Sequence, residues 1–422
     1  MSADAVSTVS RTEPRPALGT LKHLALGAFW LGTYFVIVPV YTILLPVQVG
    51  RFVRPENQGA AIGLATGVGG LLAMVIPPLV GHYSDRLRTR WGRRKPVILV
   101  GAIGSAAALL ALRSSHGYLT VMASFVAVVA LMNTAGAAYV ALIPDTVARH
   151  ETGKASGLWG AFLQAGGALA LMLVFFLATG RMLGQVYFLL AAALLLTLIP
   201  SLWAIGARDE SRRGRNRRID LRRFLAPLWS GDFGWAFLTR LLTTAGFFTI
   251  LPFLLLIFRQ FESVSHPVRF TALFELAVTG IAIPVSILCG WLSDRHGRKR
   301  FVYASGALAF AVLLVMLTTS RVPVPFLVAL ALVYGLSYGA FSAVDWALAL
   351  DTLPDRDNPA KDLGLFHVAD ALPRVVIPVV AGAVLDTFNQ VQPGFGFRAV
   401  FALAIVFYLF GTVFVSRIRS VG

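Results

Sequence analysis

The chain has 422 residues, of which 57% are hydrophobic and only 14% are charged, and its mean hydropathy is +0.74. This composition excludes a water-soluble globular protein and indicates a polytopic membrane protein, whose unit is an apolar segment of about 20 residues. The single cysteine, Cys289, excludes a disulfide framework and a zinc ribbon. The formal net charge of +17 leaves a nucleic-acid-binding surface to be considered.

Residues 1–21 are polar, contain proline and lack the apolar core of a signal peptide, so we expect a disordered tail. Twelve apolar segments follow, at residues 23–47, 58–82, 96–113, 118–143, 156–180, 184–206, 233–258, 268–292, 301–319, 323–350, 362–387 and 396–416. Because such runs are too long and too continuously apolar for barrel strands, they predict an all-α fold of twelve transmembrane helices. We expect a six-helix bundle at 22–206, a cytoplasmic linker at 207–231 and a second six-helix bundle at 232–417.

The basic residues are distributed unevenly along this pattern. With these boundaries, 27 of the 37 Lys and Arg residues fall in the two terminal segments and on one set of alternate loops. Basic loops stay on the cytoplasmic side of a membrane, so both termini are predicted to be cytoplasmic in a multi-pass protein of the cell (inner) membrane. The charge is thereby explained by topology, and we expect no nucleic-acid partner. Within the linker, Ile219–Trp229 fits both an interfacial amphipathic helix and a plain solvated segment.

A basic loop occurs twice, after the second and after the eighth predicted span. Gly81 and Asp85 lie 209 positions before Gly290 and Asp294, which is about half of the chain. A half-length repeat of membrane spans is typical of a transporter with two pseudosymmetric halves. An acid at a helix C-terminus needs a basic partner, so we expect each loop to latch neighbouring helices together. The predicted latch residues are Gly81, Asp85, Arg86, Gly92, Arg93, Arg94, Gly290, Asp294, Arg295, Gly297, Arg298 and Lys299.

The competing interpretation is that these basic residues only anchor the topology, which requires basic content but no fixed Asp–Arg–x–Gly–Arg order.

The paired loops resemble the loop motif of the major facilitator superfamily. The longer first copy, from Asp85 to Pro96, is similar to that of glycoside–pentoside–hexuronide cation symporters and sucrose–proton symporters. The resemblance covers residues 22–417 and implies the major facilitator fold and transport by alternating access.

Ionisable side chains inside membrane spans are costly and point to function. The spans contain Asp345, Asp370, Arg374, Arg240 and Glu275, which we predict to form a proton-coupling pathway. A carboxylate that alternates between an arginine partner and a proton can couple proton entry to the movement of the halves. The alternative is a static buried ion pair, Asp370 with Arg374 at i, i+4. Asp145, Asp351 and Asp386 lie near span ends and are interpreted as boundary residues.

A second group of side chains offers contacts for a solute. Three aromatic residues of the first span, Trp30, Tyr34 and Tyr41, share a helix face and suit stacking on a sugar. Asn133, Gln164, Tyr338 and His367 add hydrogen-bonding groups. Packing inside the bundle is the competing interpretation for the aromatic residues.

The leading hypothesis is therefore a proton-coupled secondary transporter for a small solute, a sugar or glycoside, acting as a monomer in the lipid bilayer. Because the first two spans contain no Asp or Glu, a proton is favoured over sodium as the coupling cation. An efflux antiporter and a non-transporting membrane assembly factor on the same scaffold remain alternatives. An enzyme is disfavoured, because no nucleophile motif, metal motif or phosphate loop is found, and no cofactor or metal is expected.

Overall fold

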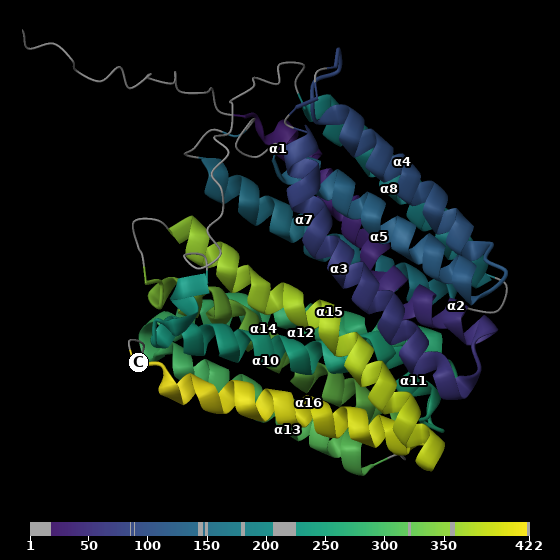
Figure 1. Cartoon of the computed structure of the whole chain (residues 1–422), viewed down its shortest axis with the longest axis vertical. Helices are drawn as coiled ribbons and strands as arrows, with labels where there is room; N and C mark the ends of the chain where they lie inside the picture. Colours follow the sequence, from purple (N-terminus) through teal and green to yellow (C-terminus); the bar gives the residue numbers. More distant parts are fainter. Residues whose placement is uncertain are drawn as a thin grey trace, which may run out of the picture.

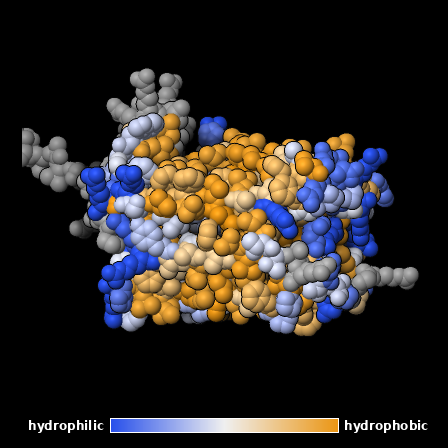
Figure 2. Space-filling view, turned by 90° about the horizontal axis from the view of Figure 1, so that it is seen from below, coloured by the Kyte–Doolittle hydropathy of each residue, from blue (hydrophilic) through white to orange (hydrophobic). Residues whose placement is uncertain are grey.

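The computed structural model describes residues 18–84, 86–87, 89–141, 147, 151–178, 182–205, 225–319, 322–354 and 359–419. Across these residues it contains twelve helices that are long and apolar enough to cross a membrane. Figure 2 shows the corresponding surface, with an apolar belt between two polar ends. The predicted all-α fold is thus confirmed, because a chain in lipid satisfies its backbone polar groups within helices.

The first half of the chain contributes six spans, one of which is built of two helices. Their bounds are α1 Thr20–Pro39 continued by α2 Leu45–Phe52, α3 Gln58–Ser84, α4 Lys95–Arg113, α5 Tyr118–Val140, α7 Thr152–Leu177 and α8 Leu183–Ala204. The second half repeats the pattern with α10 Asp232–Ile250 continued by α11 Leu254–Arg259, α12 Pro267–His296, α13 Arg298–Thr318, α14 Val324–Asp351, α15 Pro359–Val391 and α16 Phe395–Phe414. Of the linker, Ala226–Trp229 is a 3₁₀ turn, and residues 206–224, with most of the possible amphipathic piece, lie outside the described residues.

Two spans that were expected to be continuous helices are interrupted at corresponding places. The first contains a π-helical segment, Val40–Leu44, directly after Pro39, and the seventh contains a 3₁₀ segment, Leu251–Phe253, around Pro252. A proline inside a helix lacks the N–H that the regular hydrogen-bond ladder requires, so the ladder changes there. The two irregular segments pack against each other across the halves.

The two ends of the bundle differ in how the halves meet. We call the end at which α1 begins and α16 ends the terminal end, and the other the distal end. At the distal end, one hydrophobic core contains buried side chains of both halves, such as Val40 and Phe253. At the terminal end, two separate cores form, one around Tyr139 in the first half and one around Phe366 in the second. The halves are therefore joined at the distal end and packed independently at the terminal end.

The seam between the halves follows α3 and α15, which lie side by side toward the distal end and diverge toward the terminal end (Figure 1). Glycines of α3 permit this close approach, since a Cβ at Gly63 would collide with the carbonyl oxygen of Pro378. Nearer the terminal end, a Cβ at Gly81 would meet no atom within 4 Å. On the other side of the molecule, α7 packs against α12, and the Arg269 Nε donates a hydrogen bond to the carbonyl oxygen of Phe175 at 2.9 Å.

Candidate functional site

Four ionisable side chains of the second half form one connected group, which we call the charge cluster. Arg240 of α10 pairs with Asp345 of α14, with 2.8 Å between Nη1 and Oδ2. The other nitrogen, Nη2, lies 4.0 Å from Oδ1 of Asp370 on α15. Asp370 in turn accepts a hydrogen bond from Arg374 Nη2 at 2.6 Å. With two cations and two anions the cluster is neutral, which is what makes its burial in a membrane helix bundle tolerable.

Aromatic rings pack against Arg240, which we call the inner end of the charge cluster. The Arg240 guanidinium lies 4.9 Å from the ring centre of Trp346 and 4.7 Å from that of Phe366. Phe366, Asp370 and Arg374 follow one another at intervals of four residues and so share one face of α15. Arg240 is only 6% exposed, and its planar cation gains from both rings in addition to its carboxylate partner.

Arg374, which we call the outer end of the charge cluster, lies near the first half of the molecule. The Arg374 side chain is 48% exposed and lies within electrostatic range of Tyr34 and Tyr41 of the first span. Tyr338 of α14, stacked on Phe247 with 5.1 Å between ring centres, lies within the same range of Arg374. Tyrosines of both halves therefore surround Arg374.

The structure brings together some of the predicted solute-binding residues and separates others. Tyr34, Tyr41, Tyr338 and the exposed His367 lie around the outer end of the charge cluster. Trp30 instead packs edge-on against Phe29 and Tyr139, 5.5 and 6.1 Å away between ring centres. This contact agrees with the competing interpretation, in which the aromatic residues pack inside the bundle. Trp30 and Tyr34 share a helix face, but Trp30 packs on Tyr139 while Tyr34 lies near Arg374.

The two polar residues predicted for the first half lie in other surroundings than the charge cluster. Asn133 donates a hydrogen bond to the Val129 carbonyl of its own helix at 2.8 Å, and Gln164 is partly buried in α7. Glu275, the fifth predicted coupling residue, is buried on α12 outside the charge cluster and lies beside Thr42 of the π-helical segment. Glu275 thus lies between the halves.

The corresponding place in the first half has a different chemistry. The segments Lys154–Trp159 and Lys361–Phe366 match each other as Lys-x-x-Gly-Leu-aromatic, 207 positions apart, so Trp159 corresponds to Phe366. Trp159 packs against Tyr139 at 5.8 Å, and Tyr139 stacks on Phe29 at 4.0 Å between ring centres. An aromatic cluster therefore stands in the first half where the charge cluster stands in the second, although both halves share their architecture.

At the terminal end, the second basic loop forms ion pairs that join neighbouring helices. Arg298 Nε lies 2.6 Å from Oδ2 of Asp351 on α14, and Arg298 Nη2 lies 3.5 Å from Oδ1 of Asp294 on α12. Gly297 has a φ of 85°, a conformation that favours glycine and turns the chain directly from α12 into α13. Asp351 was interpreted only as a boundary residue, and the structure makes it the partner that joins α14 to the latch.

Other predicted latch residues make local contacts or lie outside the described part of the chain. Arg295 lies over the ring of Trp291 at 4.0 Å, while Lys299 is partly buried. In the first loop, Gly92 has a φ of 87°, the buried Arg94 donates a hydrogen bond to Ser84 Oγ at 2.6 Å, and Arg93 is also buried. Arg86 is exposed, Gly81 and Gly290 lie within the ends of α3 and α12, and Asp85 falls outside the described residues.

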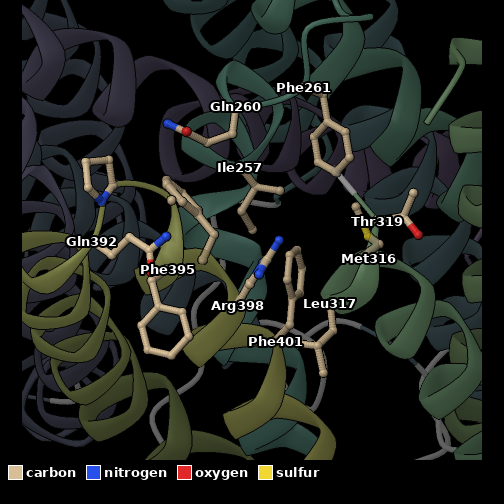
Figure 3. Close-up of a pocket in the computed structure, with 13 residues that line it drawn as sticks. Ile257, Gln260, Phe261, Met316, Leu317, Thr319, Gln392, Phe395, Arg398 and Phe401 are labelled. Carbon is tan, nitrogen blue, oxygen red and sulfur yellow. The ribbon is translucent and has the colours of Figure 1, made fainter. Parts of the chain in front are cut away.

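Two cavities lie at the distal end, away from the charge cluster. One of about 220 Å³ is bounded by α11, α13 and α16, and Arg398 extends into it between Ile257 and Phe401 (Figure 3). The other, of about 400 Å³, is lined by residues of both halves, among them Glu56, Arg259 and Asp386. Asp386 is a functional candidate that was interpreted only as a boundary residue, because nothing in its local pattern shows that it contacts the other half.

Comparisons with known proteins agree with this architecture. A family model described as MFS/sugar transport protein matches residues 23–358. The chain is 25% identical over 377 residues to an uncharacterized MFS-type transporter of Methanocaldococcus jannaschii, covering 86% of this chain and 89% of that protein. It is 40% identical over 101 residues to a lactose permease of Lactobacillus helveticus, a match that covers 22% of this chain and 14% of the permease.

Among solved structures, the nucleoside transporter NupG superposes with a TM-score of 0.74 at 16% identity, over 95% of this chain and all of that one. Identity this low shows a shared fold and no shared substrate. The resemblance inferred from the repeated loop is confirmed, and the protein stands among transporters rather than enzymes. The chain belongs to the MFS/sugar transport protein family of the major facilitator superfamily.

Proposed function

We propose that the protein is a secondary active transporter that moves a small hydroxylated solute, a sugar or glycoside, across the cell membrane by alternating access with proton coupling. The observation that carries the proposal is the charge cluster, which is anchored at Arg240 and opens at Arg374 toward the tyrosines of the other half. A site shared by two halves changes its access when the halves move relative to each other. The match to a lactose permease and the family description support a sugar as the solute.

The charge cluster supplies different roles at its two ends. Arg240 is enclosed by two rings and Asp345, so it serves as a fixed cation. Arg374 is half exposed and has Asp370 as its partner, so this pair can open when a solute hydroxyl or a proton replaces one partner. Protonation of Asp370 frees the guanidinium for the solute, and return of the carboxylate releases it. Tyr34, Tyr41 and Tyr338 present rings and hydroxyl groups suited to a sugar.

The terminal end is assigned to the cytoplasm, because it carries most of the basic residues. With this assignment, the distal seam lies on the outer side of the membrane. Glu275 of α12 faces the first span. It is a second carboxyl that can exchange a proton when the two halves separate at the distal end. The transport unit is a monomer with both termini cytoplasmic.

The test uses purified protein in liposomes that contain a pH-sensitive dye. Mono- and disaccharides, glycosides and nucleosides are added one at a time, and internal pH and solute content are followed. We expect one sugar class to enter together with protons. Arg374→Ala lowers uptake about tenfold or more, the size of a lost hydrogen bond to a charged group. The matched control is Arg398→Ala, which removes an exposed arginine at the distal end and leaves uptake unchanged.

Uptake of a nucleoside and of no sugar contradicts the substrate class. Solute entry without a pH change contradicts proton coupling. If no solute of the panel moves while the protein remains folded and monodisperse, the proposal of a solute transporter is wrong, and an assembly factor on this scaffold takes its place.

A further inference from the structure

Asp386, near the distal end of α15, caps a helix of the other half. Its side chain accepts hydrogen bonds from the backbone N–H of Gly59 at 2.9 Å and from that of Ala60 at 2.6 Å. Both amides belong to the first turn of α3, where backbone N–H groups have no partner within their own helix. Asp386 is 5% exposed; its bond with Gly59 is buried, and its bond with Ala60 is partly buried.

This cap differs from an ordinary one in where its residue comes from. Helix caps are normally supplied by the residue that directly precedes the helix. Here the capping carboxylate lies 327 positions along the chain from Gly59, on the other half of the molecule. A carboxylate also interacts favourably with the positive end of the helix dipole. The amides of α3 therefore have this partner only while the halves are together at the distal end.

The close contact between the backbones of α3 and α15 continues along α3 beyond the cap. A Cβ at Gly59 would collide with Asp386 and with the carbonyl oxygen of Gly382, and one at Gly63 with that of Pro378. The same holds for Gly67 against Val375. At these three glycines the two helices are in direct backbone contact, so a separation of α3 from α15 at the distal end also breaks the cap.

The cavity of about 400 Å³ lies on the outer side of the same contact. Glu56 and Gln58 of the first half and Arg259, Gln260 and Asn389 of the second line it together with Asp386. This cavity is lined by both halves and ends at the cap. We interpret the cap as the point at which a pathway between the halves is closed at the distal end.

We propose that Asp386 is a gate residue, whose cap on α3 holds the distal end shut and is broken and remade in each transport cycle. Its meaning for the cycle rests on the proposed transport function, while the gate itself is a statement about conformation. Loss of the cap favours the state open at the distal end by about tenfold, as expected for one helix cap. Asn retains one acceptor oxygen, so Asp386→Asn lies between wild type and Asp386→Ala.

The experiment measures distances between spin labels across the distal end by pulsed electron paramagnetic resonance, on the full chain in lipid nanodiscs. Labels are attached at Ser114→Cys and Thr319→Cys, both exposed, in a Cys289→Ser background. We expect Asp386→Ala to add a longer-distance population, and Asp386→Asn a smaller one. Gly63→Val, which separates α3 from α15 sterically, moves the distribution in the same direction.

Glu56→Gln is the matched control, because it removes a carboxylate from the same cavity and keeps the cap. If Asp386→Asn and Asp386→Ala give the wild-type distance distribution, the gate assignment is wrong. It is equally wrong if Glu56→Gln shifts the distribution as much as Asp386→Ala, since local charge would then set the distance. A protein that transports no solute but responds to Asp386→Ala contradicts the proposed function and leaves the gate intact.

Discussion

At the scale of single residues, the energetic cost of the buried carboxylates depends on their arginine partners. Arg240 and Asp345 are almost completely buried, and each satisfies the charge of the other. Removal of one member leaves an uncompensated charge in a low-dielectric interior, whereas removal of both leaves none. The loss of stability on removal of one side chain is therefore larger than the net contribution of the pair.

We expect Arg240→Ala to lower the free energy of unfolding by about 3 to 5 kcal/mol, because Asp345 loses its close partner. The double variant Arg240→Ala/Asp345→Ala is expected to recover a substantial part of this loss. Denaturant titrations in detergent, followed by intrinsic fluorescence, measure both. Arg398→Ala, on the exposed surface, should stay within about 0.5 kcal/mol of wild type. A double variant less stable than Arg240→Ala would mean that the pair does not account for the effect.

At the scale of elements, the second latch joins three helix ends through one side chain. Arg298 at the start of α13 contacts both Asp294 at the end of α12 and Asp351 at the end of α14. Asp351 is more than one third exposed, so the pair contributes little to stability. Its effect lies in holding these three helix ends of the second half in fixed relative positions, so that this half moves as one body.

We expect Arg298→Ala to slow transport several-fold while solute binding and the free energy of unfolding change little, the latter by about 1 kcal/mol or less. The comparison is Arg295→Ala, which removes the same charge from a side chain that lies over Trp291. Transport rates in liposomes and binding titrations separate the two variants. Equal rates for both would favour the interpretation that the basic residues of this loop only anchor the topology.

At the scale of the whole molecule, the arrangement of the cores explains how the protein can move. One core is shared at the distal end, and each half keeps its own core at the terminal end. Under the proposed alternating access, each half would rotate as a packed body, and the distal seam would open and close. The charge cluster lies in one half only, so the chemistry is asymmetric within a symmetric frame.

The orientation in the membrane is testable with single cysteines in the Cys289→Ser background. A membrane-impermeant maleimide added to intact cells should label Ser114→Cys at the distal end. His296→Cys, exposed at the terminal end, should react only after permeabilisation. These outcomes follow from the basic residues of the terminal end. The reverse pattern would place the termini outside the cytoplasm and overturn the orientation.

The twelve spans were predictable because lipid requires long apolar helices, and their observed bounds lie within a few residues of the predicted ones at nearly every end. The repeated loop also indicated the family, because its Asp–Arg–x–Gly–Arg order has a structural cause that includes the positive φ of Gly297. The pairing of Asp370 with Arg374 was predictable from i, i+4 spacing, since both residues lie on one helix.

Contacts between distant segments were not predictable in this way. Arg240 meets Asp345 across 105 positions, Asp386 meets Gly59 across 327, and the separation of Trp30 from Arg374 depends on which neighbour each face of the first span receives. The sequence by itself determined the membrane environment, the number of helices, the duplication and which half carries the ionisable residues of the spans, because these follow from local composition and spacing. Only the tertiary structure decided which charges of different helices pair and which end of the bundle is closed, because helix packing sets those distances.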